Sequence, residues 1–308
     1  MNVLVTGSSG MLGTELCRRI QRDGHTVAGA DVNCAPDDPA GAVDIRDFTA
    51  LSRFAADTRP DMIFHLAAET NVDLCEQNPD HAFQTNALGT EHVALCAQKL
   101  DVPLVYISTA AVFDGSKSEA YTEYDAPNPI NVYGRSKLAG EEAVGRLLRR
   151  YFIFRAGWMV GGWEIDKKFV YKIVQQILDG KREIQAVDDK FGSPTFTDDF
   201  VRNMMPIVQS GRFGLYHLCG KGCASRYEIA RQIVKDMDAG LDVNVAPVPS
   251  SAFPLPAPRP RMEALRNHKL DLLGMNQMQS WRDNLRRYIV ENLKHTHPVS
   301  DSVAARTC

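Results

Sequence analysis

The sequence contains no apolar run of membrane-spanning length, and the strand-like residues Asn2 to Thr6 follow the first methionine with no basic segment before them. We therefore expect neither secretion nor membrane insertion, and we expect a cytoplasmic protein. The net charge is only −3, so electrostatics give no reason to expect nucleic acid or an anionic membrane surface as a partner. The expected partner is a small molecule.

The sequence also lacks a cysteine pattern that would form a disulfide framework or a metal site. Its seven cysteines are scattered, at positions 17, 34, 75, 96, 219, 223 and 308. Cys219 and Cys223 are the one close pair, and no second pair or histidine cluster accompanies them. We expect reduced thiols and no bound metal.

What the sequence does contain is a regular alternation of strand-like and helix-like segments up to about residue 156. This alternation is typical of an α/β protein with a Rossmann-type, doubly wound parallel sheet. From Gly157 onwards the elements become shorter, which indicates a smaller C-terminal α/β substrate-binding lobe. We expect a dinucleotide-binding domain at 1–156, a substrate-binding lobe at 157–294 that is interleaved with it, and a disordered tail at 295–308.

A glycine-rich turn joins the first strand to the first helix. Gly7, Gly10 and Gly13 are spaced as in a dinucleotide-binding turn, where they permit a tight turn, close approach of backbone N–H groups to a diphosphate, and close packing of helix on strand. No Gly-Lys-Ser/Thr closes the turn, which excludes a phosphate loop of the nucleotide triphosphatase type. The turn therefore predicts a dinucleotide site.

Two acidic residues follow at positions where the adenosine is expected. Asp31 ends the second strand, 18 residues after Gly13, and would accept hydrogen bonds from the ribose hydroxyls, favouring NAD over NADP. A turn or N-cap aspartate is the alternative. Asp44 and Ile45 could lie beside the adenine, although Asp44 could equally cap the helix that follows.

Tyr133 and Lys137 stand four residues apart where a helical pattern begins. This spacing places both side chains on one helix face. A lysine charge beside a phenol favours the phenolate, so the pair could transfer protons near neutral pH. The same spacing occurs by chance on many amphipathic helices.

Several polar and small residues are expected to complete the site. Leu66, Ala67 and Ala68 end a buried strand and would form the cofactor floor, and Ser108 and Thr109 follow the next strand at its carboxyl end, where such sheets place their ligands. Asn86, in a helix predicted from about Pro79 to Lys99, could organise water or backbone groups near the site.

The C-terminal third offers candidates for substrate binding. Trp158 could stack on the sugar or base, although a boundary of the core is a commoner place for an aromatic residue. Arg259 and Arg261 end a proline-rich extended segment, 246–260, and could bind a diphosphate, with surface ion pairing as the rival interpretation.

Three motifs resemble the extended short-chain dehydrogenase/reductase superfamily: Thr6-Gly-x-x-Gly-x-x-Gly13, His65-Leu-Ala-Ala68 and Tyr133-x-x-x-Lys137. More narrowly, the stretches 107–115, 129–142, 191–195 and 214–218 resemble dTDP-4-dehydrorhamnose reductases. The resemblance extends to about residue 292.

The resemblance implies an NAD(P)H-dependent reductase of a nucleotide-linked 4-keto-6-deoxy sugar. It implies that Tyr133 protonates the 4-keto oxygen, that Thr109 hydrogen-bonds the same oxygen, and that Lys137 tunes Tyr133 and holds the nicotinamide ribose. The expected substrate-binding residues are Thr109, Ala110, Trp158 and Arg259. The expected cofactor-binding set is Gly7, Ser9, Gly10, Met11, Leu12, Gly13, Asp31, Asp44, Ile45, Leu66, Ala67, Ala68, Asn86, Ser108, Tyr133 and Lys137.

One residue departs from the reductase pattern and keeps two other functions open. Ala110 stands where such reductases commonly have an aspartate, and nucleotide-sugar epimerases tend to carry alanine there. Together with Asp31, this alanine makes a 4-epimerase with a permanently bound NAD an alternative. A non-catalytic dinucleotide-binding subunit, like the regulatory subunit of methionine adenosyltransferase, is another. Mainly from the resemblance, we also expect a homodimer formed through the helices near 82–99 and 136–150.

Overall fold

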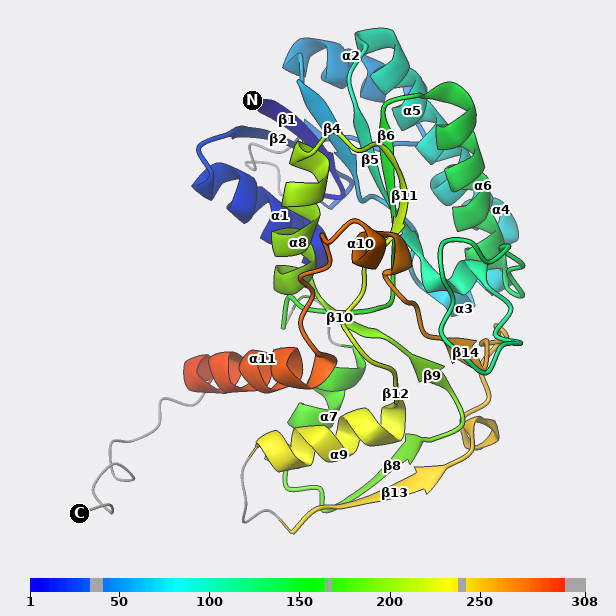
Figure 1. Ribbon diagram of the computed structural model, residues 1–308, viewed down its shortest axis with the longest axis vertical. Helices are drawn as coiled ribbons and strands as arrows, with labels where there is room; N and C mark the ends of the chain where they lie inside the picture. Colours follow the sequence, from blue (N-terminus) through cyan, green and yellow to red (C-terminus); the bar gives the residue numbers. More distant parts are fainter. Residues whose placement is uncertain (34–40, 164, 166–167, 238–241, 297–308) are drawn as a thin grey trace, which may run out of the picture.

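The computed structural model describes residues 1–33, 41–163, 165, 168–237 and 242–296. A seven-stranded sheet in the order β11-β6-β5-β4-β1-β2-β3 lies at the centre of the larger part of the molecule (Figure 1). Every pairing in it is parallel. This confirms the predicted Rossmann-type α/β fold. Its strands are β1 (Asn2–Thr6), β2 (Thr26–Asp31), β3 (Gly41–Ala42), β4 (Met62–His65), β5 (Leu104–Thr109), β6 (Tyr151–Ala156) and β11 (Gly214–His217).

Helices cover both faces of this sheet, so its strands are apolar on both sides. On one face α1 (Met11–Arg22) and α8 (Thr197–Gln209) pack against Val3, Phe64 and Phe152. The other face is covered by α2 (Phe48–Thr58), α5 (Gly89–Leu100) and α6 (Val132–Leu147), which pack against Leu4 and Ile63. The two resulting cores hold the sheet rigid beneath the site.

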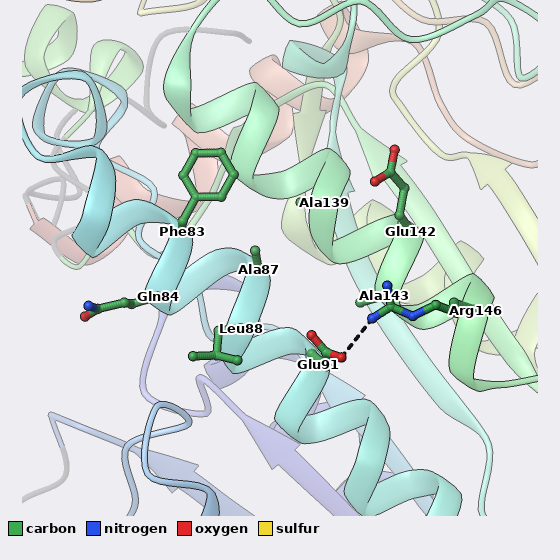
Figure 2. A pocket seen from close by; sticks show the side chains of 9 residues that line it. All are labelled: Phe83, Gln84, Ala87, Leu88, Glu91, Ala139, Glu142, Ala143 and Arg146. Carbon is green, nitrogen blue, oxygen red and sulfur yellow. Dashed lines mark hydrogen bonds and ion pairs between the residues drawn. The ribbon is translucent and has the colours of Figure 1, made fainter.

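The helix predicted from Pro79 to Lys99 consists of three consecutive helical segments. It begins as α4 (Pro79–Phe83), widens into the π-helical turn η1 (Gln84–Leu88) and continues as α5, with the short α3 (Val72–Gln77) before it. A groove of about 410 Å³ runs between η1, α5 and α6 on the outside of this layer (Figure 2).

The second lobe is built from short strands and three helices, drawn in the lower half of Figure 1. Its core gathers around Trp163, Val174 and Trp281. The segment 246–260, expected to be extended, includes most of β13 and the short 3-10 turn η3. Apart from α8 and β11, the elements that follow β6 in the chain are β7 (Trp158–Val160), α7 (Phe169–Leu178), β8 (Glu183–Val187), β9 (Phe191–Gly192), β10 (Pro194–Phe196), β12 (Ala224–Ser225), α9 (Arg226–Asp236), β13 (Asn244–Val248), η3 (Ser250–Ala252), β14 (Met262–Glu263), α10 (His268–Leu272) and α11 (Trp281–Thr296). Of these, α10 lies beside β11 of the large sheet.

The chain crosses between the two lobes more than once. After leaving the sheet at Ala156 it returns to supply α8 and β11, and then α10, which contacts β11. Segments after residue 156 therefore contribute to the large sheet and its layers, and the division into domains at residue 156 stays a prediction. The predicted tail falls almost wholly outside the described residues, and α11 extends to Thr296.

Candidate active site

The glycine turn lies where the strand order of the sheet reverses, between β1 and β4. Gly7 has φ +72°, and a Cβ there would lie 2.6 Å from the backbone nitrogen of Ala67. A Cβ on Gly13 would lie 2.1 Å from the carbonyl oxygen of Gly7. Both positions exclude a side chain. Gly10 is the N-cap of α1 and offers no side-chain cap, so the first N–H groups of the helix remain available to an anion.

Asp31 is buried, and both of its carboxylate oxygens accept backbone hydrogen bonds. Oδ2 accepts from the N–H of Ser9 at 3.0 Å and Oδ1 from the N–H of Asn33 at 2.9 Å. Asp31 therefore shapes the glycine turn and also lies on the wall of the cavity described next. The structure is therefore compatible with both interpretations of Asp31, as a turn residue and as an acceptor for the ribose hydroxyls.

One cavity of about 990 Å³ extends from Asp31 to the second lobe. Most of the residues selected from the sequence line it. They are Gly7, Ser9, Gly10, Met11, Leu12, Gly13, Asp31, Asp44, Ile45, Leu66, Ala67, Ala68, Ser108, Thr109, Tyr133, Lys137, Trp158 and Arg259. The glycine turn at one end and the uncapped N-terminus of α1 fit the diphosphate of a dinucleotide, as the sequence predicts.

Tyr133 and Lys137 lie in the first two turns of α6. Asn131 starts this helix: its Oδ1 accepts from the N–H of Gly134 at 2.8 Å, and its Nδ2 donates to the carbonyl oxygen of Pro258 at 3.0 Å. The cap thereby fixes the start of α6 and ties it to the segment that precedes β14. Both side chains line the cavity, as expected for residues four apart on one helix face.

The protonation of the pair differs from the sequence expectation. Burial raises the pKa of Tyr133 to about 12, although hydrogen bonding to Thr109 opposes the increase. Burial also lowers the pKa of Lys137 to about 7, against the opposing charge of Glu141. The expected lowering of the phenol pKa by Lys137 is not found. Burial is the largest influence on the pKa of Tyr133, and the charge of Lys137 is not among the causes of its shift.

Arg155 and Glu141 form a buried ion pair, and the negative charge of Glu141 raises the pKa of Lys137. Arg155 Nε and Nη2 donate to the two oxygens of Glu141 at 2.9 and 2.6 Å. The hydroxyl of Ser108 donates to Glu141 Oε1 at 2.5 Å, and Lys137 Nζ lies 4.3 Å from the centre of the Tyr106 ring. Ser108 therefore uses its hydroxyl within the protein, whereas the sequence assigned that hydroxyl to a ligand.

Asn86 lies behind the cavity wall and is not among its lining residues. Its side chain is fully buried in η1 and bonds both backbone groups of Glu69: Oδ1 accepts from the N–H at 2.8 Å, and Nδ2 donates to the carbonyl at 3.0 Å. Nδ2 also donates to Ser136 on α6 at 3.0 Å. Asn86 thus organises backbone near the site, as the sequence allowed, and does not face the cofactor end directly.

Ala110 also lies off the cavity, in disagreement with its expected role in binding substrate. A 3-10 turn, η2 (Ala110–Val112), follows β5, and it buries Ala110 in a cluster with Phe113 and Cys219. Its neighbour Ala111 lines the cavity instead. Ala110 therefore gives no evidence about substrate type.

The end of the cavity in the second lobe carries charged residues that the sequence did not single out. Lys190, Arg226 and Glu263 line it, and the guanidinium of Arg226 lies 3.9 Å from the centre of the Trp158 ring. Arg259 also lines this end and forms an ion pair with Asp73 at 2.9 Å. Arg261 is exposed and does not line the cavity. These residues are far apart in sequence, so no local pattern identifies them.

Arg46 at the opposite end was also missed, and it lies beside the expected adenosine position. Its guanidinium pairs with Asp44 at 2.6 Å.

Within the described ranges, no group of three or more His, Cys, Asp and Glu side chains is arranged to hold a metal ion. No helix of the described chain has both the length and the apolar character needed to cross a membrane.

The fold, with the glycine turn at the start of α1 and a helix that carries Tyr133 and Lys137, is that of the extended short-chain dehydrogenase/reductase class. The chain belongs to the family described as RmlD substrate binding domain, whose model matches residues 1–294.

Several relatives share about a third of their residues with the chain. It is 33% identical over 285 residues to a dTDP-4-dehydrorhamnose reductase of Mycolicibacterium smegmatis, covering 92% of this chain and 83% of that protein. It is 31% identical over 289 residues to the spore coat polysaccharide biosynthesis protein SpsK of Bacillus subtilis, covering 94% and 97%.

Solved structures agree with this assignment. The dTDP-4-dehydrorhamnose reductase of Bacillus anthracis, solved in complex with NADP, matches with a TM-score of 0.86 and 34% identity, covering 94% of this chain and 98% of that one. A UDP-glucose 4-epimerase of Thermus thermophilus shares the fold, with a TM-score of 0.81 at 22% identity and coverage of 94% and 98%.

Proposed function

We propose that the protein is an NAD(P)H-dependent reductase of a nucleotide-linked 4-keto-6-deoxy sugar, of the dTDP-4-dehydrorhamnose reductase type. The observation that carries this proposal is a single cavity with a dinucleotide turn at one end, basic side chains at the other, and Thr109, Tyr133 and Lys137 between them. Several relatives at about a third identity are named as reductases of this kind.

In the proposed reaction, Tyr133, Thr109 and Lys137 each have a defined role. The dinucleotide supplies the hydride to the sugar carbon. Tyr133, whose pKa of about 12 keeps it protonated at neutral pH, donates its proton to the carbonyl oxygen, and Thr109 hydrogen-bonds the same oxygen. Lys137, with a pKa near 7, can return a proton to the phenolate and can bind the nicotinamide ribose.

The far end of the cavity suits the rest of the substrate. Lys190, Arg226 and Arg259 place positive charge there, and a sugar nucleotide carries a diphosphate between its two halves. Guanidinium groups bind phosphate oxygens with two parallel hydrogen bonds. The indole of Trp158 forms a flat wall against which a sugar ring can pack.

Both dinucleotides fit the proposal, with different partners for their 2′ positions. Asp31 favours a free 2′-hydroxyl, as in NADH. Arg46 supplies a cation that could turn from Asp44 to a 2′-phosphate, as in NADPH. We therefore propose NADH binding at least as tight as NADPH binding, with partial tolerance of the phosphate.

The test is to incubate the purified protein with NADH or NADPH and a panel of 4-keto sugar nucleotides. Stoichiometric loss of nicotinamide absorbance is the result expected for a reductase. Sugar conversion without net consumption would indicate the epimerase, and an inert protein the regulatory subunit. Two residues suggested the epimerase: Ala110 lies off the cavity and no longer favours it, whereas Asp31 lines the cavity and keeps this alternative open.

Tyr133→Phe examines the proton donor. Turnover should fall at least about a hundredfold, while dinucleotide affinity stays nearly unchanged, because the variant loses the donor and little else. Tyr124→Phe is the matched control, since Tyr124 is 68% exposed and does not line the cavity. Full activity in Tyr133→Phe would contradict the mechanism.

A further inference from the structure

A carboxylate lies among the basic groups at the substrate end of the cavity. Glu263 is the second residue of β14, which pairs with β9, and its side chain faces the cavity. Its Oε2 accepts a hydrogen bond from Trp158 Nε1 at 2.9 Å. Within the described part of the chain, Oε1 accepts none, and Glu263 forms no ion pair with a neighbouring cation.

The indole that holds Glu263 is itself fixed in place. Arg226 covers one part of the Trp158 ring at 3.9 Å. Gly192 leaves room for the ring, because a Cβ there would lie 2.3 Å from Trp158 Cε2. Because the Trp158 ring is held in place, its hydrogen bond orients the Glu263 carboxylate before the substrate binds.

Unlike the cations beside it, the Glu263 carboxylate is not a group that can bind a diphosphate. Burial raises the pKa of Glu263, while Trp158, Arg226, Arg259 and Lys190 counteract that increase. Its negative charge also repels phosphate oxygens. An accessible carboxylate oxygen here therefore suits a neutral hydrogen-bond donor on the substrate, and the surrounding cations disfavour an ammonium group.

Glu263 and Tyr133 line the same cavity. The negative charge of Glu263 is also one of the smaller influences that raise the pKa of Tyr133. The part of a sugar nucleotide that comes near Tyr133 is the sugar ring, whose neutral donors are hydroxyls.

We propose that Glu263 is a specificity-determining residue that accepts a hydrogen bond from a ring hydroxyl of the sugar through Oε1. This inference rests on the proposed function and deepens it, since it specifies a sugar that keeps a hydroxyl at C2 or C3.

The experiment compares three substrates with the wild-type protein and with Glu263→Ala. The substrates are dTDP-4-dehydrorhamnose and its 2-deoxy and 3-deoxy analogues. The wild-type kcat/KM should favour the parent over one analogue by about 10- to 100-fold, the effect of one hydrogen bond to a charged acceptor. In Glu263→Ala this preference should fall below about threefold, mainly through a higher KM for the parent.

Two further variants separate recognition from a structural effect. Glu263→Gln keeps an acceptor oxygen and should retain part of the preference. Trp158→Phe keeps an aromatic ring but releases Oε2, and it should reduce the preference without abolishing it. Stronger diphosphate binding after loss of the negative charge would change all three substrates equally and leave the ratio unaltered.

The outcomes distinguish this inference from the proposed function. Wild-type protein that reduces none of the sugar nucleotides overturns both. Reduction without discrimination between parent and analogues, or a preference in Glu263→Ala equal to that of the wild type, overturns the role of Glu263 alone. A preference lost in Glu263→Ala and partly restored in Glu263→Gln supports it.

Discussion

Lys137 illustrates how a reactive residue reduces the stability of its own fold. Its pKa is about 7 in the folded protein and about 10.4 in an unfolded chain. The folded state therefore disfavours the charged form, and the destabilising contribution is complete below pH 7 and disappears as the pH rises through 10.4.

We expect Lys137→Met to be more stable than the wild type at pH 7, by a few kcal/mol as an order of magnitude. The difference should shrink steadily between pH 7 and pH 10. Urea denaturation across this range measures it, and Lys99→Met, which removes an exposed lysine, is the matched control. A constant difference over the whole range would contradict a buried, titrating Lys137.

Variants of Asp31 can show whether its carboxylate binds the ribose of the dinucleotide or only shapes the glycine turn. Asp31→Ala should weaken NADH binding by roughly 1–3 kcal/mol, while NADPH binding holds steady or tightens. Asp31→Asn is the control, because it keeps an acceptor oxygen for one backbone N–H but loses the charge. Fluorescence titration with both dinucleotides measures the effect. Equal weakening of the two would show that Asp31 acts only on the turn, through Ser9 and Asn33.

Single residues were predictable where the chemistry is local. The spacing of Tyr133 and Lys137 and that of the glycines could be recognised because each set lies within one turn and helix. Glu263 and Arg226 could not, because their contacts with Trp158 depend on how distant segments fold together. The direction of the Tyr133 pKa shift was mispredicted for a related reason: burial is a property of the folded cavity.

At the level of elements, the start of α6 connects the fold to the chemistry. Asn131→Ala removes the N-cap, which should lower the free energy of unfolding by about 1 kcal/mol. It also frees the first turn, which carries Tyr133, so kcat should fall. Asn131→Asp keeps the accepting oxygen but loses the donor to Pro258, and it should preserve most of the stability. Denaturation and steady-state kinetics on both variants test this, and unchanged kcat in Asn131→Ala would separate the cap from catalysis.

The π-helical turn η1 shows why element boundaries were harder to predict than elements. The apolar periodicity predicts one helix over residues 79–99, and a nearly continuous helix is present. The turn widens around Asn86, whose partners Glu69 and Ser136 lie on other segments. Tertiary hydrogen bonds of this kind leave no signal in the local sequence.

For the molecule as a whole, the groove in Figure 2 bears on the expected homodimer. Phe83 and Leu88 are 39% and 45% exposed beside it, and Glu91 and Arg146 form an ion pair across it at 2.8 Å. We predict a dimer in sedimentation at micromolar concentration, and a monomer for Leu88→Arg. Leu272→Arg, at a 67% exposed position outside the groove, is the control. A monomeric wild type would count against the interface.

The architecture was predictable because alternating strands and helices leave few ways to form a parallel sheet. The return of β11 was not predicted: Gly214–His217 is a four-residue segment, and nothing in it distinguishes an edge of the large sheet from a strand of the small lobe. The order of strands depends on crossovers that only the folded chain reveals.

The late arrival of β11 has a consequence for synthesis on the ribosome. β6 is complete at Ala156, but its outer partner ends only at His217. In the interval, the backbone groups along one side of β6 have no strand to pair with. The side chains of Phe152 and Phe154 also remain uncovered until α8 has been made. Unpaired edges and uncovered apolar faces promote association between chains, so the nascent chain should be most prone to association before its second half has been translated.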